Sequence, residues 1–440
     1  MLRRRTALLP LLVALLIIPA ACAGNLEEPV GVNGSPTRGS GPSAPTRFDT
    51  AGQVRLPQEA EGLPSRVLFG VAHQPLPLVL SGTTAYVATH TTLLAVGLRT
   101  GRTVAEIGPE NTAVRSDPRD AGWNPAAPPV LADRGGESTL VVPLLVTVGK
   151  GGPGASRTAV ELIEVQPTTN RRMQSVTVEV GADVRPAEPA QDQQWPAVIG
   201  VVGSMAVLRV GRITYGVDLA RKAPVWQEDG FSGAAIVDDV VVGWFDEGAT
   251  QRAAGLRAAD GSRIWADRAP STRLSVVAGG PRFAVLQGRA GANGGDRYLR
   301  LVRAATGRVE PLPANVAAVV AGSSTLDGDA FACRYDGAAT TVCGAIWDDW
   351  NSAFDAATGR WMWEVRADTS GRTPIRLTAA WHGRVYGTEN GTRPVVLDAR
   401  TGAVREPSAA AAPYVISASF GVGPLVLGDG IYAFPVKPDR

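Results

Sequence analysis

The sequence predicts an all-β protein, a β-propeller of four-stranded antiparallel blades, from three observations. A short turn motif recurs seven times along the chain. The clearest copies follow short, β-branched runs bounded by Gly, Asp or Pro, which is the pattern of strands. No long stretch shows the period of an amphipathic helix. Many short strands in four-stranded repeats are typical of a propeller.

The best copy of the motif is the stretch Ser352–Val365, S-A-F-D-A-A-T-G-R-W-M-W-E-V. It predicts a strand, a tight turn at Thr358-Gly359 and a second strand. The six other copies end in a similar turn, and they are Val96–Gly101, Val165–Asn170, Val217–Lys222, Gly255–Gly261, Leu301–Gly307 and Val396–Gly402. The copy ending at Lys222 lacks the glycine. At Asn170 we expect asparagine to replace it, because asparagine tolerates a positive φ.

Further strands are expected before each turn. In the fourth copy they are Ala234–Val237 and Val240–Trp244, and in the first they are Pro77–Leu80 and Ala85–Thr89. The Ala- and Arg-rich run Arg252–Ala259 could suggest a helix. Since it aligns with the strands of the other copies, we expect a strand there.

The copies resemble the repeats of the pyrroloquinoline-quinone-like (PQQ-like) propeller superfamily, A-x-D-x-x-T-G-x-x-x-W, over about Val67 to Val436. The pattern is fullest at Asp355–Trp363. Its tryptophan occurs in three copies, as Trp226, Trp265 and Trp363. In that family the tryptophan docks between neighbouring blades, so the resemblance implies a structural docking role for these three residues.

The two ends of the chain predict how the ring closes. Three strand-like runs end the sequence, at Tyr414–Phe420, Pro424–Leu427 and Ile431–Val436, and a lone run, Arg66–Val71, lies near its start. An N-terminal strand would complete the last blade. Seven full blades and one shared blade make eight, or seven if a degenerate copy is misread.

The N-terminus is expected to be an export signal, residues 1–21. Three arginines, Arg3–Arg5, precede an apolar run, Ala7–Ala21, which is shorter than the roughly 20 residues of a membrane span. Pro19-Ala20-Ala21-Cys22 resembles the lipobox of bacterial lipoproteins, with Pro19 where that family usually has leucine. The resemblance implies that Cys22 is lipidated, carrying acyl chains such as palmitate. Ala21-Cys22-Ala23 also fits ordinary cleavage, which would release the chain.

Residues 22–64 are expected to be the lipidated cysteine and a disordered tether, followed by the propeller at 65–440. The stretch from Gly24 to about Glu61 is rich in Gly, Pro, Ser, Thr and Asn, and such a composition does not repay the entropy of ordering. The expected location is the extracytoplasmic face of the cell membrane, with secretion as the alternative.

Two of the three cysteines, Cys333 and Cys343, flank R-Y-D-G-A-A-T-T-V. In an exported protein this spacing predicts a disulfide that closes a hairpin-like loop. The alternative is two free, buried cysteines.

The candidate binding residues lie in the long segments that are not motif turns. These segments are Gly108–Ala127, Gly149–Thr158, Gly181–Gln194, Gly288–Arg297 and Tyr335–Asn351. The last contains Trp347, Asp348, Asp349 and Trp350, which we interpret as a candidate ligand or partner site, because binding residues concentrate in loops on a rigid scaffold. The first contains Arg115, Arg119 and Trp123. The alternative is that the tryptophans pack the loops down.

The composition excludes several functions. Charged residues are 19% and the formal net charge is +2, which gives no strong field for nucleic acid. No Walker, G-x-S-x-G or H-E-x-x-H motif is present and only three histidines occur, so we expect no catalytic residue, metal or cofactor.

The leading hypothesis is therefore a non-enzymatic, membrane-anchored propeller lipoprotein. It would act as a binding or scaffold module for an envelope protein or a surface polymer. In fold and anchor it resembles the propeller lipoproteins that assist outer-membrane protein assembly. One alternative is a quinoprotein dehydrogenase, although such enzymes in the superfamily carry two adjacent cysteines and this chain has none. The other is a protein that binds a glycan or a small ligand.

Overall fold

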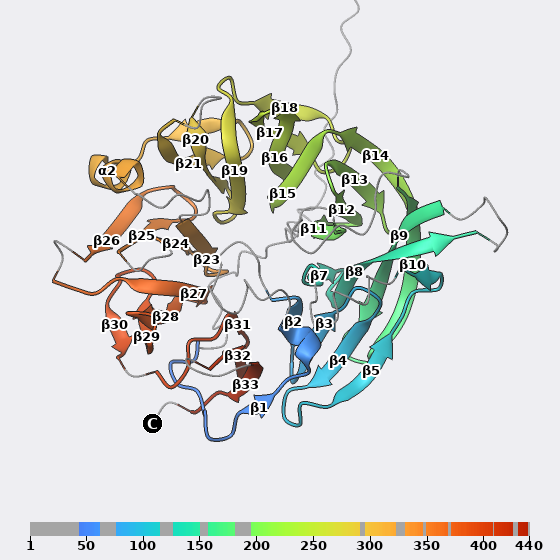
Figure 1. Cartoon of the computed structure of the whole chain (residues 1–440), viewed down its shortest axis with the longest axis horizontal. Helices are drawn as coiled ribbons and strands as arrows, with labels where there is room; N and C mark the ends of the chain where they lie inside the picture. The colour runs from blue at the N-terminus through green and yellow to red at the C-terminus, as the bar shows by residue number, and fades with distance from the viewer. Residues whose placement is uncertain are drawn as a thin grey trace, which may run out of the picture. The chain divides into compact units, whose positions relative to one another are not determined.

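The computed structural model describes residues 44–61, 76–114, 126–149, 157–180, 195–290, 295–322, 331–345, 349–367, 371–407, 409–425 and 430–438. The chain divides into two units, residues 1–30 and 31–440, and every described residue belongs to the second. Within this second unit antiparallel sheets stand around a ring (Figure 1). The prediction of an all-β propeller is confirmed.

Four of the sheets are simple blades, in which the strands follow one another in chain order from the centre of the ring outwards (Figure 1). The first two are β2 (Leu78–Ser81), β3 (Thr84–Ala88), β4 (Leu93–Gly97), β5 (Thr103–Ile107) and β11 (Ala197–Val202), β12 (Met205–Val210), β13 (Ile213–Asp218), β14 (Ala223–Asp229). The other two are β23 (Phe331–Tyr335), β24 (Thr340–Ala345), β25 (Trp350–Asp355), β26 (Trp361–Arg366) and β27 (Ile375–Trp381), β28 (Arg384–Glu389), β29 (Arg393–Asp398), β30 (Val404–Glu406). We call the four strands of a blade A to D.

One sheet has eight strands. They are β15 (Phe231–Val237), β16 (Val240–Glu247), β17 (Thr250–Arg257), β18 (Arg263–Ala266), β19 (Ser271–Ala278), β20 (Phe283–Ala290), β21 (Arg297–Arg303) and β22 (Arg308–Glu310). The two halves are joined through one residue pair, Gln251 and Ser271. Each half has its own copy of the turn motif, so we treat them as two blades. The run Arg252–Ala259, expected as a strand, lies largely in β17.

The blade that follows β5 is the most elaborate. It consists of β6 (Thr112–Ala113), β7 (Val130–Arg134), β8 (Glu137–Val148), β9 (Arg157–Gln166) and β10 (Arg171–Glu179). The first half of β8 pairs with β7 and its far end pairs with β6. The sheet therefore extends beyond the length of the other blades.

The last blade closes the ring with a strand from the N-terminal part of the chain. Its strands are β31 (Val415–Ile416), β32 (Phe420–Pro424), β33 (Ile431–Pro435) and β1 (Val54–Arg55). Closure by an N-terminal strand is confirmed, but the strand is Val54–Arg55, and Arg66–Val71 lies outside the described residues. The middle strand is also corrected, from Pro424–Leu427 to Phe420–Pro424.

Residues 44–61 consequently belong to the propeller and not to the expected tether. Phe48 is 1% exposed and packs against Tyr386 in a tilted arrangement, with ring centroids 6.0 Å apart. The Tyr386 hydroxyl donates a hydrogen bond of 2.7 Å to the carbonyl of Pro45. The composition around these residues is poor in large apolar side chains. Backbone pairing with the edge of β33 and burial of Phe48 and Leu56 nevertheless stabilise this segment against the propeller.

All seven motif copies form the turn between strands C and D of a blade. In the best copies the aspartate shapes the turn: Asp398 Oδ1 accepts hydrogen bonds from the backbone N–H of Arg400 and Thr401, at 3.1 and 3.0 Å. Asn170 has a φ of 55°, as predicted for the residue that replaces glycine, and Lys222 has a φ of 56°.

The three motif tryptophans, Trp226, Trp265 and Trp363, each contact the C–D turn of the next blade. Their indole nitrogens donate hydrogen bonds of 2.8, 2.6 and 2.8 Å to the carbonyls of Ala258, Ala304 and Ala399. A Cβ on Gly402 would lie 2.8 Å from the Trp363 ring. The motif glycine is thus needed for close packing as well as for its positive φ.

Polar side chains join the blades at the opposite end. The buried amide of Asn351 donates to the carbonyl of Ile375 at 2.9 Å and accepts from its N–H at 2.6 Å. Gln287 donates in the same way to the carbonyl of Phe331, at 3.0 Å. These bonds reach the first residues of the next blade's inner strand.

The alternation of antiparallel strands gives each blade two different ends. The A–B and C–D turns lie at one end, which we call the turn face. The B–C loops and the connections between blades lie at the other, which we call the loop face. The strand ends that flank Gly108–Ala127, Gly149–Thr158, Gly181–Gln194 and Gly288–Arg297 all open onto the loop face.

Candidate functional site

Trp350, a predicted binding residue, lies in the core. It has no exposed surface, and its ring meets Phe331 edge-on with centroids 5.7 Å apart. Its indole nitrogen donates a hydrogen bond of 2.9 Å to Glu364. This part of the predicted site is therefore corrected: Trp350 packs β25 against its neighbours and cannot contact a ligand at the surface.

The rest of that candidate site is divided. Trp347 and Asp348 lie outside the described residues, and Asp349 is exposed. The segment Tyr335–Asn351 is also not a single loop, because the buried strand β24 runs through it. Apart from its two threonines, Thr340–Ala345 has no polar residue, and it forms the buried strand β24 where a binding loop was expected.

Cys333 and Cys343 form the predicted disulfide, and they face each other across the β23–β24 hairpin. At the tip of the hairpin the buried Asp336 accepts hydrogen bonds from Ala338, Ala339 and Thr340 N–H at 2.8, 2.9 and 3.0 Å. Its second oxygen accepts a bond of 3.0 Å from Gly383 N–H in the next blade. The disulfide thus sits in a hairpin that helps to join two blades.

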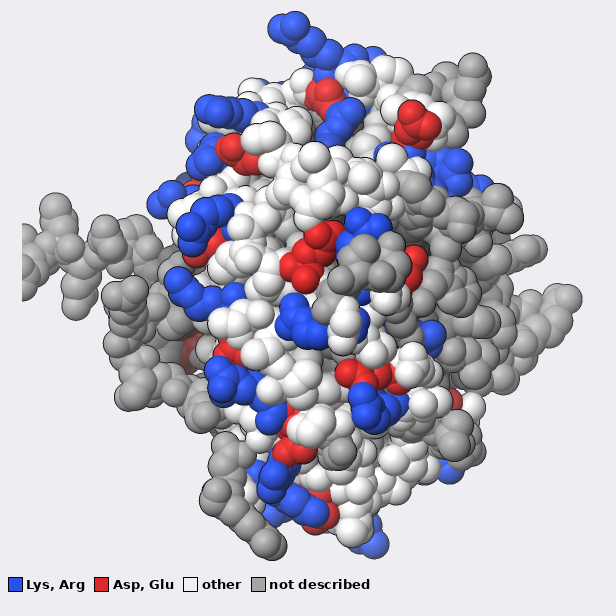
Figure 2. Space-filling view, turned by 90° about the vertical axis from the view of Figure 1, so that its left-hand side faces the viewer, with Lys and Arg blue, Asp and Glu red and all other residues white. Residues whose placement is uncertain are grey.

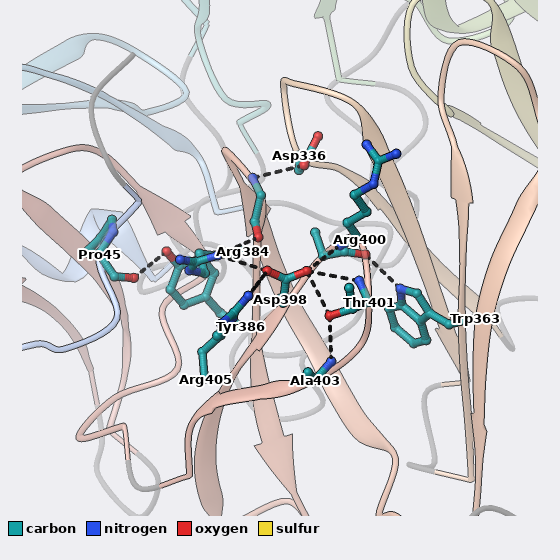
Figure 3. Close-up of polar contacts among 12 residues, drawn as sticks. Pro45, Asp336, Trp363, Arg384, Tyr386, Asp398, Arg400, Thr401, Ala403 and Arg405 are labelled. Atoms are coloured by element: carbon teal, nitrogen blue, oxygen red, sulfur yellow. Dashed lines mark hydrogen bonds and ion pairs between the residues drawn. The ribbon is translucent and has the colours of Figure 1, made fainter. Parts of the chain in front are cut away.

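A polar network on the turn face surrounds Asp398, at the β29–β30 turn (Figure 3). One oxygen shapes the turn, and the other pairs with Arg405 Nη2 at 2.8 Å and Arg384 Nη1 at 3.3 Å. Burial alone would raise the pKa of Asp398, but the bonds from Arg405 and Thr401 together hold it below its ordinary value. The network has no group placed to act on a substrate, and we assign it to the scaffold.

A cavity of about 420 Å³ opens on the loop face, between the β3–β4 loop and the chain that follows β5. This is the volume of a small-ligand pocket. Its lining exposes more apolar than polar surface and includes hydroxyl, imidazole, carboxylate and amide groups. The lining residues are His90, Thr91, Thr92, Glu106, Pro109, Asn111, Thr112 and Ala113.

The β3–β4 side of the cavity is shaped by one buried hydroxyl. Thr89 Oγ1 accepts hydrogen bonds from the N–H groups of Thr91 and Thr92, at 3.1 and 2.8 Å. It donates in turn to the carbonyl of Thr92 at 2.9 Å. Because this turn holds the backbone, Thr91 and Thr92 have fixed positions in the cavity wall.

The other side is held by Glu161, a carboxylate on β9 with no exposed surface. It accepts a hydrogen bond from Glu110 N–H at 2.7 Å, and from the N–H and side-chain amide of Asn111 at 3.1 and 2.9 Å. A buried carboxylate needs such partners. Glu161 therefore fixes the cavity wall from the neighbouring blade.

A second set of polar side chains lies on or beside the innermost strands, the A strands, of two blades. Arg334 on β23 and Tyr414, the residue before β31, lie close enough to interact electrostatically. Burial lowers the pKa of Arg334, and burial raises the pKa of Tyr414 while Arg376 and Arg334 oppose that rise.

The described residues include no group of three or more His, Cys, Asp or Glu side chains able to hold a metal ion. In that same part of the chain no helix is long and apolar enough to cross a membrane. The one α-helix found there, α2 (Ala314–Gly322), packs Val316 and Val320 into the core, and the 3₁₀ turn η1 spans Gln58–Ala60.

No known family model matches the chain, and no curated protein matches it. Solved structures are similar in arrangement. BamB from Moraxella catarrhalis is 13% identical with a TM-score of 0.43, over 87% of this chain and 97% of BamB. The quinohemoprotein alcohol dehydrogenase ADHIIG from Pseudomonas putida HK5 is 10% identical with a TM-score of 0.45, over 82% of this chain and 74% of the enzyme. The WD40 repeats of RRP9 are 10% identical with a TM-score of 0.40, over 90% and 99%. Likeness at this level says nothing of activity, ligand or partner.

Sequence reasoning did not find the cavity. Its walls come from two blades, and Glu161, which fixes one of them, lies in an otherwise apolar strand, A-V-E-L-I-E-V. The sequence signal that points to the cavity is the pair of acids, Glu161 and Glu164, in a run whose other residues are apolar. The predicted residues Arg115, Arg119 and Trp123 lie outside the described residues.

Proposed function

We propose that the protein is a non-enzymatic binding module, held at the extracytoplasmic side of the cell membrane by a lipid on Cys22. Its loop face would bind an envelope protein or a surface polymer. The observation that supports this best is the difference between the two faces. The turn face is built from tight, repeated turns, whereas the strand ends that flank four of the five long segments, and the cavity, open onto the loop face.

Site-specific cross-linking in intact cells tests the assignment to the loop face. A photo-reactive residue would replace Thr112, an exposed residue of the cavity wall, or Thr103, an exposed residue beside the C–D turn of the same blade. We expect a reproducible adduct from position 112 and none from position 103. Equal adducts from both positions, or none from either, would contradict the proposal.

The lipid anchor is tested independently by Cys22→Ala. If Cys22 carries the anchor, the variant is released from the membrane fraction, and labelled palmitate is incorporated only by the unchanged chain. A variant that stays in the membrane fraction and a chain that takes up no label would both oppose the anchor.

A second candidate function is the binding of a small polar ligand in the cavity. The fixed hydroxyls of Thr91 and Thr92 and the amide of Asn111 favour a ligand rich in hydrogen-bonding groups, such as a sugar. Thr91→Val removes one hydroxyl at nearly constant volume. A glycan array read with this variant and the unchanged chain would support the candidate if binding is lost, and oppose it if neither chain binds.

A further inference from the structure

The first described residues of the propeller lie at the turn face. Phe48 pairs with Val436, just beyond the end of β33, and Lys437 N–H donates to the carbonyl of Arg47 at 3.0 Å. This end of β33 also pairs with Phe420, which begins β32 immediately after the A–B turn. The N-terminal part of the chain therefore joins the propeller at the turn face of the last blade.

Exposed cations occupy the same face. Six of the seven C–D turns have an exposed arginine or lysine in or next to the turn, and these residues are Arg102, Arg171, Lys222, Arg308, Arg360 and Arg400. Among the described residues, none of the six forms an ion pair. In the seventh turn Asp260 is exposed and Arg263 lies over the Phe245 ring.

The acids of the C–D turns offset only part of this charge. Asp218 pairs with Arg221, and Asp398 pairs with Arg384 and Arg405, so these two carboxylates pair with arginines outside the six. Asp355 lies close enough to Arg400 to interact with it electrostatically. Apart from Asp260, exposed acids of the turn face, such as Glu137 and Asp238, occur in A–B turns, which lie nearer the centre of the ring. The outer edge of the turn face is therefore a cationic rim.

Figure 2 shows the side of the molecule that carries β26 and β30. Several Lys and Arg side chains project along the left-hand edge of that side, and other Lys and Arg side chains lie among the Asp and Glu side chains across its middle.

We propose that the cationic rim of the turn face binds an anionic phospholipid surface. This inference rests on the proposed anchor at Cys22, since both would hold the same face to the same membrane. Because Ala44 lies 22 residues after Cys22 in the sequence, a lipid on Cys22 would limit how far the turn face could move from the head groups. Each cation close to an anionic surface strengthens binding about fivefold at physiological ionic strength.

The arrangement gives the two faces separate tasks. The turn face contacts the membrane, and the loop face, with the cavity, points away from it toward a partner. The repeated turn sequence T-G-R in three copies, ending at Arg102, Arg308 and Arg360, then has a use beyond the scaffold.

Vesicle sedimentation tests the proposal with the mature chain from residue 22 carrying Cys22→Ala. Because no lipid is attached, the result does not depend on whether Cys22 is modified. We expect binding to vesicles that contain phosphatidylglycerol, little binding to pure phosphatidylcholine, and a steep fall with added salt. The variant R308Q/R360Q/R400Q should bind the anionic vesicles about a hundredfold more weakly.

The matched control removes three exposed arginines from the loop face, as R157Q/R212Q/R268Q, and has the same net charge. It should bind as the parent chain does. An equal loss in both variants, or no preference for anionic vesicles, would overturn the proposal. So would binding to immobilised polyglutamate without binding to vesicles, which would identify an acidic polymer in place of the membrane.

Discussion

The indole nitrogen of Trp363 donates a hydrogen bond of 2.8 Å to the carbonyl of Ala399 in the next blade. The same ring covers Gly402, three residues further along. One side chain thus joins two blades through a polar and an apolar contact, and the same relationship recurs at Trp226 and Trp265.

Trp363→Phe should lower the free energy of unfolding by about 1 kcal/mol, because the ring contact is mostly kept while the hydrogen bond is lost. Urea denaturation measures the change. Trp361 on the same strand is the matched control, since its buried indole nitrogen has no acceptor among the described residues. Trp361→Phe loses no hydrogen bond, so an equal cost in both variants would show that the bond to Ala399 contributes little.

Lys222→Gly should stabilise the protein by about 1 kcal/mol. Lys222 occupies the glycine position of its turn with a φ of 56°, a left-handed conformation that is unfavourable for residues with a Cβ. Thermal denaturation would show a raised midpoint. Gly402→Ala provides the opposite change, because its φ is 67° and a Cβ would collide with Trp363. A lowered midpoint in Lys222→Gly would contradict the interpretation of this turn.

The turns were predictable because their chemistry is local. Asp398, Thr401 and Gly402 shape one turn by themselves, and Asn170 takes the place of glycine in another. Cys333 and Cys343 also paired as expected, since both lie in one hairpin.

The rest depends on contacts between distant parts of the chain. Trp350 resembled a loop aromatic, but Phe331 and Glu364 place it in the core. The closing strand, Val54–Arg55, is too short to show a strand pattern in the sequence. It is a strand because it pairs with the edge of β33. The cavity needs Thr89 and Glu161 from two blades, and no stretch of sequence contains both.

Trp350→Ala should lower the free energy of unfolding by about 3–5 kcal/mol, as expected for removing a fully buried indole. The loss would follow from packing against Phe331 and from the unpaired Glu364. Chemical denaturation measures it, with circular dichroism to confirm that the variant folds. A variant as stable as the parent chain would mean that Trp350 is not in the core.

Reduction of the Cys333–Cys343 disulfide should destabilise the protein by up to about 3 kcal/mol, by the chain-entropy estimate for a loop this short. The midpoint of thermal denaturation should fall when a reductant is added. The double variant C333A/C343A should start from the lower midpoint and show no response to the reductant. A parent chain that does not respond either would mean that the disulfide is absent or contributes nothing.

Asp398 should make the protein sensitive to acid. Its folded-state pKa lies below the ordinary value of 3.8, so the carboxylate contributes stability above that pH and loses it as the pH falls through the lowered pKa. Asp398→Asn should therefore lower the thermal midpoint at pH 7, and the difference from the parent chain should shrink below about pH 4. Asp238→Asn, in an exposed A–B turn, controls for the loss of one charge. If the difference between Asp398→Asn and the parent chain were constant from pH 7 to pH 3, the ion pairs with Arg405 and Arg384 would not be the source of the stability.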